Sequence, residues 1–290
     1  MRPRLSMAGA ALFFAVSFLL LYRDILAKLI HDWGASDNYS HGFLIAPLAL
    51  YFVWERRPLL SALQPRPSLV GVVLIIASLA VCTVGMLGAE LFLMRISMVG
   101  VLAGSVVFAC GWAALRVLAF PLLFLLLMIP LPAIVFNQVA FPLQLFASEV
   151  GESILSALGI PVLREGNLIL LASTTLEVAE ACSGIRSLVS LLTLGLVYGY
   201  FTDRRTGVRS AIALSAVPIA IVSNAARVAG TGVVAHYTGP EAAEGFFHTF
   251  SGWIVFIAGL ILLVCVQVTL ARLFPVRSEE ESHRPGMEAA

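Results

Sequence analysis

The sequence predicts an all-α polytopic membrane protein with about eight transmembrane helices and a small extracytoplasmic β-like cap before Cys182. Of the 290 residues, 60% are apolar and 12% are charged, whereas a soluble domain has about 25% charged residues. Apolar runs close to the roughly 20 helical residues that cross a bilayer recur along nearly the whole chain. We therefore expect one integral membrane domain, residues 1–275, followed by a polar and disordered tail, residues 276–290.

Eight apolar stretches are the predicted spans. They cover residues 5–22, 42–54, 69–88, 93–113, 117–135, 184–201, 210–227 and 250–271. The first stretch has the basic start and apolar centre of a secretory signal, but no small-x-small cleavage site precedes Tyr22, so we interpret it as an uncleaved anchor. The second stretch is short, and prolines interrupt the fifth.

The region between the fifth and sixth spans combines two kinds of pattern. The stretch "FNQVAFPLQLFASEVGESILSALG" has apolar residues at helical spacing with polar residues between them, which predicts an amphipathic helix lying on the membrane. In "IPVLREGNLILLASTTLEVAEAC", the turn signal Glu165-Gly166-Asn167 separates two short apolar runs, which predicts strands. Open strands are not tolerated in hydrocarbon, so we expect this segment to cap the helices above the outer leaflet.

The distribution of basic residues orients the chain. With the N-terminus in the cytoplasm, twelve of the 18 lysines and arginines fall on the inner side and six on the outer side, in agreement with the positive-inside rule. The 18 basic residues nearly balance the 17 acidic ones, so we expect no nucleic-acid partner.

This orientation places three chemically useful residues on the outer side. Cys182 begins the sixth span, Arg227 ends the seventh and His248 begins the eighth. The other cysteines, Cys82, Cys110 and Cys265, lie inside apolar runs. The four cysteines form neither a CxxC motif nor a zinc-type cluster, and we expect no metal and no cofactor.

The three residues suit acyl transfer by a thiol. A helix N-terminus and nearby guanidinium groups favour the nucleophilic thiolate at Cys182. The N-terminal position of His248 favours the neutral imidazole, and Arg227 offers several donors for a carbonyl or an oxyanion. Simpler interpretations stay open, because membrane cysteines are mostly structural, arginines at helix ends anchor helices and histidines occur among interfacial aromatic residues.

Five motifs resemble those of the exosortase family in order and spacing. They are "NYSHGFLIAPLALYFVWERR", "LGIPVLREGNLILL", "EVAEACSGIRSL", "SNAARV" and "FFHTFSGW", and the resemblance extends from about Trp33 to Trp253. It implies a multi-pass enzyme of the bacterial inner membrane that recognises C-terminal sorting signals on membrane-tethered exported proteins. Such a signal has a short Pro-Glu-Pro-like (PEP-CTERM) motif, a hydrophobic span and a basic end. The enzyme is implied to cleave near the motif and to transfer the protein to an unknown acceptor nucleophile, often alongside exopolysaccharide production.

The resemblance also assigns roles to residues. Cys182 in "ACSG" is implied to be the nucleophile that forms an acyl-thioester, and Arg227 in the Asn-x-x-Arg pattern and His248 in "HTFSG" to be the second and third catalytic residues. Archaeal relatives resemble this pattern but have arginine at the third position. His248 is therefore either a general base or a donor to the transition state.

Four further residues are candidates for supporting or substrate-binding roles. Asn224 precedes Arg227 by three positions, on the same helical face; Arg186 closely follows Cys182; Glu180 could tune the thiol; and His41 in "YSHG" is a reserve base. Helix packing, a solvated strand face and a hydrogen-bonded loop histidine are the simpler interpretations of Asn224, Glu180 and His41.

Two other functional classes stay open at this stage. A polysaccharide or lipid transporter, or an assembly factor for one, also has repeated spans and a broken helix, but it should carry polar groups near mid-membrane. A non-catalytic scaffold that binds sorting signals is the third possibility. For each class we expect membrane lipids as neighbours.

Overall fold

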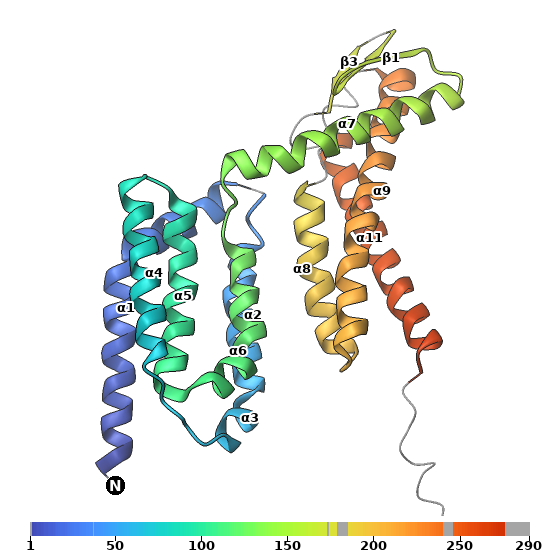
Figure 1. The fold of residues 1–290 in the computed structure, drawn as a ribbon. Helices are drawn as coiled ribbons and strands as arrows, with labels where there is room; N and C mark the ends of the chain where they lie inside the picture. Colours follow the sequence, from blue (N-terminus) through green and yellow to red (C-terminus); the bar gives the residue numbers. More distant parts are fainter. Residues whose placement is uncertain (1, 37, 173, 179–184, 240–245, 276–290) are drawn as a thin grey trace, which may run out of the picture. The chain divides into compact units, whose positions relative to one another are not determined.

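The computed structural model describes residues 2–36, 38–172, 174–178, 185–239 and 246–275, and helices dominate it (Figure 1). The prediction of an all-α membrane fold with a small sheet is confirmed. The chain divides into two compact units, Met1–Asn137 and Gln138–Ala290. The predicted tail, residues 276–290, lies outside the described residues.

The first unit contains six helices and one 3-10 turn in its described residues, and the start of a further helix. These are α1 (Arg2–Ala35), α2 (Gly42–Glu55), α3 (Arg57–Ala62), α4 (Val70–Leu87), α5 (Leu91–Cys110), α6 (Trp112–Phe124), the 3-10 turn η1 (Leu125–Met128) and the first residues of α7 (Ala133–Ala157). Helices α4 and α5 approach closely, because a Cβ atom on Gly71 would lie 2.2 Å from the backbone nitrogen of Phe108. Close approach through small residues is how apolar helices associate in a membrane.

Helix α1 continues past residue 22, where the first span was predicted to end, and includes a charged stretch. Arg95 of α5, which is 2% exposed, donates to the Asp32 carboxylate at 2.5 Å, and Lys28 lies 3.0 Å from the same carboxylate. Tyr22 and Ser97 share a hydrogen bond of 2.9 Å between their hydroxyl groups. A charge among apolar helices is tolerated when it is paired, so these contacts explain why α1 remains helical to Ala35.

The break after α6 has a local cause. Pro130 and Pro132 have no N–H, so they cannot donate to the carbonyl groups of Leu126 and Met128 as an α-helix requires. Instead, the indole nitrogen of Trp33 donates to the Met128 carbonyl oxygen at 2.9 Å.

The second unit begins with most of α7 and a three-stranded cap. Strands β1 (Val162–Glu165), β2 (Leu168–Leu171) and β3 (Thr175–Glu177) are antiparallel in the order β1-β2-β3. The predicted turn is confirmed, since Gly166 joins β1 to β2 with φ of 65°, a conformation that glycine adopts without strain. Apolar side chains of the cap pack against α7 and helix α9 (Thr206–Thr238) in a cluster that includes Leu155, Ile169, Val178 and Val228.

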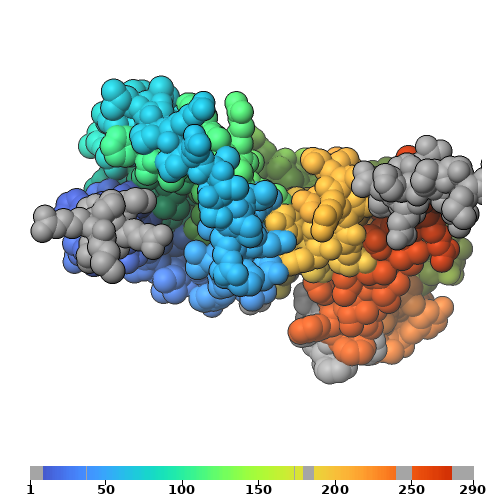
Figure 2. Space-filling model, turned by 90° about the horizontal axis from the view of Figure 1, so that it is seen from below, coloured from blue at the N-terminus to red at the C-terminus, as the bar shows by residue number. Residues whose placement is uncertain are grey.

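Three helices complete this unit: α8 (Ile185–Thr202), α9 and α11 (Phe246–Leu273). Their shared core includes Leu191 of α8, Ile212, Ala216 and Ile219 of α9, and Leu263 of α11. Figure 2, which shows the molecule from below, places the gold α8 directly beside the orange-red α11. The packing of these three helices therefore fixes the position of α9 relative to α11.

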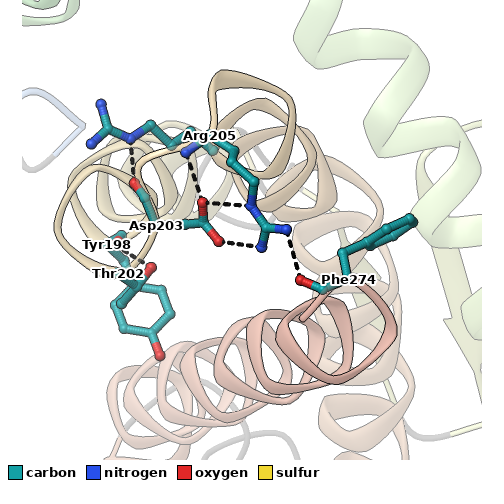
Figure 3. Close-up of polar contacts among 6 residues, drawn as sticks. Tyr198, Thr202, Asp203, Arg205 and Phe274 are labelled. Atoms are coloured by element: carbon teal, nitrogen blue, oxygen red, sulfur yellow. Dashed lines mark hydrogen bonds and ion pairs between the residues drawn. The ribbon is translucent and has the colours of Figure 1, made fainter. Parts of the chain in front are cut away.

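The turn between α8 and α9 is held by ion pairs and backbone bonds (Figure 3). Arg205 donates to both carboxylate oxygens of Asp203, at 3.0 Å from Nε and 2.7 Å from Nη2, and to the Phe274 carbonyl oxygen at the end of α11 at 2.7 Å. Hydrogen bonds from the Arg205 side chain lower the pKa of Asp203 to about 2. One arginine thus joins the α8–α9 turn to α11.

The number of spans differs from the prediction. In the described parts of the chain, six helices are long and apolar enough to cross a membrane: Gly9–Ala35, Val70–Leu87, Leu91–Cys110, Ala133–Ala157, Thr206–Thr238 and Phe250–Leu273. The prediction of about eight spans is therefore wrong in number. Helix α2 has 14 residues and α6 has 13, short of the roughly 20 that span a bilayer, whereas α7, predicted to lie on the membrane, has 25. Helix α8, the predicted sixth span, is not among these six. The side chains of its residues 186–202 are described.

Candidate active site

Of the three predicted catalytic residues, Arg227 is the one whose side chain lies in the described part of the structure. It lies on α9, is half-buried, and donates through Nε to Oγ of Ser251 on α11 at 3.3 Å. The bond links two sequence motifs, "SNAARV" and "FFHTFSGW", through residues that are 24 positions apart in the chain. The sequence did not single out Ser251, and its place inside the "HTFSG" motif was the signal that could have identified it.

His248 lies in the first turn of α11, which begins at Phe246, and its side chain is outside the described residues. It precedes Ser251 by three positions. Residues three apart occupy the same face of a helix, one turn apart. The fold thus brings position 248 within one helical turn of the residue that binds Arg227.

Cys182 and Glu180 lie outside the described residues, but both flanks of their segment are described. On one side, Val178 is buried in the cluster that contains Val228, the residue after Arg227, and its N–H donates to the Asn167 carbonyl oxygen at 2.9 Å. On the other side α8 begins at Ile185, with half-buried Arg186 in its first turn. The described flanks of the segment with the predicted nucleophile are therefore the cap, which packs against α9, and the first turn of α8.

Asn224 and Arg227 face different surroundings on α9. Asn224 is 2% exposed and lies between Ala220 and Val228 on the buried face of the helix. Arg227 lines a groove between α9 and α11, and Asn224 is not among the residues that form it. The position of Asn224 suits a polar contact inside the helix packing.

The groove is mostly apolar and has a volume of about 450 Å³. Its described lining comprises Val222, Ser223, Ala226, Arg227, Gly230, Thr231 and Val234 of α9, and Ser251, Ile254, Val255, Ala258 and Leu262 of α11. Arg227 is the one charged residue of this described lining. A donor in an apolar environment forms stronger hydrogen bonds than it does in water, so the groove is a suitable place to bind a carbonyl oxygen.

His41 belongs to the first unit, where it precedes α2. Its Nε2 lies 3.2 Å from the Leu127 carbonyl oxygen of η1. Burial lowers the pKa of His41, and hydrogen bonds to the backbone of Leu127 and Asn38 act in the opposite direction. A ring nitrogen that faces a carbonyl oxygen acts as a donor, so these contacts suit a role in holding the broken end of α6.

None of the described residues form a group of three or more His, Cys, Asp or Glu side chains that could hold a metal ion. What the described part of the site offers is a guanidinium group at the wall of an apolar groove. Of the other predicted residues, Cys182 and Glu180 precede α8, Arg186 lies in the first turn of α8 and His248 in the first turn of α11.

Comparison with known families agrees with the five motifs. The family model for the transmembrane exosortases (Exosortase_EpsH) matches residues 33–265. The chain belongs to the transmembrane exosortase family. The match includes Cys182, Arg227 and His248 as well as the four supporting candidates. A search of curated proteins and a search of solved structures each gave no match.

Membership of the exosortase family and the apolar helices together identify a multi-pass membrane protein that processes sorting signals. In this exosortase, two of the family motifs are in contact: Arg227 of "SNAARV" on α9 donates to Ser251 of "FFHTFSGW" on α11.

Proposed function

We propose that this exosortase is a cysteine endopeptidase and transpeptidase that cleaves PEP-CTERM-like sorting signals. The observation that carries the proposal is the hydrogen bond from Arg227 to Ser251, which joins two family motifs at the wall of one groove. A catalytic donor must be held in place before the reaction begins. The contact supplies one fixed point for the guanidinium group.

Chain connectivity supports the inclusion of Cys182 in the same site. Four residues of fully extended chain span at most about 14 Å, and Cys182 lies four residues after Val178. Val178 packs in one cluster with Val228, next to Arg227. Cys182 also lies three residues before Ile185, where α8 begins. Both limits are compatible with a thiol close to Arg227, as the proposal requires.

The proposed reaction has two steps that share one acyl-thioester. First, the Cys182 thiolate attacks the carbonyl carbon of the scissile peptide bond, a C–S bond forms, and the C–N bond breaks as the leaving amine takes up a proton. Then an acceptor amine, or water, attacks the thioester carbon and releases the thiolate. An amine acceptor gives transpeptidation and water gives hydrolysis.

Arg227 and His248 serve the oxyanion and the proton in this proposal. Arg227 donates to the carbonyl oxygen as negative charge develops on it. His248 either carries the proton to the leaving amine or donates a hydrogen bond to the transition state. Arg186 supports the site from the first turn of α8, and buried Asn224 contributes through the packing of α9.

The proposed substrates are exported proteins that remain tethered by a C-terminal apolar helix. The enzyme resides in the bacterial inner membrane with its N-terminus in the cytoplasm and its site on the extracytoplasmic side. A tethered substrate reaches the site by lateral diffusion, which raises its effective concentration and allows a short motif to suffice. Production of exopolysaccharide is the proposed cellular context.

Replacement of single cysteines tests the nucleophile. We expect Cys182→Ala to insert into the membrane and to lower processing of a reporter with the sorting tail by more than about a hundredfold, because it removes the attacking atom. Cys182→Ser should also be slow, since a hydroxyl is barely ionised near neutral pH. Processing is measured as the initial cleavage rate in membranes with equal amounts of each variant.

The matched controls are the other three cysteines. Cys82 is buried in α4, and Cys110 and Cys265 are exposed in α5 and α11. We expect Cys82→Ala, Cys110→Ala and Cys265→Ala to process the reporter at the wild-type rate. Full processing by Cys182→Ala would end the cysteine-enzyme proposal and favour a scaffold or transporter.

A further inference from the structure

The groove between α9 and α11 has a chemical pattern beyond the placement of Arg227. Its volume of about 450 Å³ lies within the range of roughly 300–1,000 Å³ that is usual for ligand sites. Apart from Arg227, its described polar lining consists of the hydroxyl groups of Ser223, Thr231 and Ser251. Both helices qualify as membrane spans, so an occupant enters from an apolar environment.

Arg227 lies partway along the groove and not at its end. The α9 lining runs from Val222 to Val234, which is about 18 Å of helix at 1.5 Å per residue. Arg227 follows Val222 by five positions and precedes Val234 by seven. An occupant that fills the groove therefore has apolar groups on both sides of the atom that accepts a hydrogen bond from the guanidinium group.

This arrangement distinguishes a peptide from a lipid. A lipid carries its charged acceptor at one end and its acyl chains on one side of it. A peptide carries carbonyl oxygens between side chains that extend in both directions. Small residues along the groove, Ala226, Gly230 and Ala258, also allow a second backbone to approach closely.

We propose that the α9–α11 groove binds the apolar peptide on both sides of the scissile carbonyl group, and that Gly230 and Ala258 determine which side chains fit there. The inference rests on the proposed function and adds the place where the substrate binds. It predicts that the choice of substrate depends on the size of the substrate side chains that enter the groove as well as on the sorting motif.

Gly230 offers a direct way to fill the groove. A Cβ atom at Gly230 meets nothing within 4 Å, whereas one at Gly232 would lie 2.7 Å from Cδ1 of buried Leu155. A larger side chain at position 230 thus extends into the groove and leaves the packing of α9 on α7 unchanged. Gly207, near the start of α9, also has nothing within 4 Å of a Cβ atom and does not line the groove. It is the matched control.

The test compares Gly230→Ala, Gly230→Leu and Gly230→Phe with the same changes at Gly207. We expect the processing rate of the tailed reporter to fall stepwise with side-chain size at position 230, by about tenfold or more for leucine. The Gly207 variants should retain the wild-type rate. The amount of each variant in the membrane and its unfolding temperature in detergent show whether the fold is intact.

A binding measurement keeps the test independent of folding in the Gly230 variants. A photo-crosslinking amino acid replaces Ala258 in Cys182→Ala protein, and a second variant carries it at Leu214, which is 66% exposed on α9 and does not line the groove. We expect position 258 to capture the reporter and position 214 not to.

The outcomes separate this inference from the proposed function. If wild-type protein processes the reporter, but Gly230→Leu does so equally fast and position 258 captures lipid alone, the groove is not the peptide site and the proposed function stands. If wild-type protein does not process the reporter at all, the proposed function fails first.

Discussion

At the scale of single residues, Ser251 is the least expected member of the site. It accepts a hydrogen bond from Nε of Arg227 at 3.3 Å in a mostly apolar groove, where such bonds are stronger than in water. We expect Ser251→Ala to lower the processing rate about 10-fold to 150-fold, the equivalent of about 1.5–3 kcal/mol for a lost hydrogen bond to a charged group. Ser251 acts through Arg227, so kcat should fall more than KM rises.

Two variants separate the hydroxyl group of Ser251 from its packing. Ser251→Thr keeps the acceptor and should retain most of the rate. Ser215 on α9 donates to the Ile212 carbonyl oxygen of its own helix, so Ser215→Ala should process normally. Equal losses in Ser251→Ala and Ser251→Thr would mean that the hydroxyl group does not position Arg227.

At the scale of secondary-structure elements, the α8–α9 turn connects three helices through Asp203 and Arg205. The folded pKa of Asp203 is about 2, against an ordinary value of 3.8. A lowered carboxyl pKa stabilises the fold above the unfolded pKa, and this contribution is lost as the pH falls through the folded value. The Asp203 contribution is therefore complete above about pH 4 and disappears towards pH 2.

Replacement of Asp203 tests this contribution. We expect Asp203→Asn to lower the unfolding temperature in detergent at pH 7, and the difference from wild type to shrink between about pH 4 and pH 2. Asp24 pairs with its neighbour Arg23, and both side chains are largely exposed, at 86% and 73%, so Asp24→Asn should have little effect. A difference between wild type and Asp203→Asn that stays constant down to pH 2 would contradict the ion-pair explanation.

The elements that the sequence predicted correctly depend on local signals. Glu165-Gly166-Asn167 forms a turn because glycine accepts the positive φ, and no distant residue is needed. The first span was predicted to end at residue 22, because the sequence did not show that Asp32 is paired with Arg95, which is 63 positions away in the chain. The Arg227–Ser251 bond is of the same long-range kind. Sequence motifs identified Arg227, but only the fold reveals its partner and the groove.

At the scale of the whole molecule, the length of α9 limits how the second unit can cross a membrane. Its 33 residues extend about 50 Å, more than the roughly 30 Å of a bilayer core. Arg204, Arg205 and Arg209 cluster at its N-terminal end, whereas the cap packs around Val228 and Ala235 towards its C-terminal end. A helix of this length that spans the membrane has its two ends on opposite sides of it.

In the proposed orientation, which follows the positive-inside rule, the arginine-rich end of α9 faces the cytoplasm and the cap faces the outer side. Glu165 of the cap and Arg204 of the α8–α9 turn are both exposed, so each can become a cysteine without loss of a core contact. In protein with alanine at positions 82, 110 and 265, we expect a membrane-impermeant thiol reagent to label Glu165→Cys in intact spheroplasts and to label Arg204→Cys only after lysis. The protein without an introduced cysteine gives the baseline from Cys182. Labelling of Arg204→Cys alone in intact spheroplasts would reverse the orientation and place the proposed site in the cytoplasm, where exported substrates do not present their signals.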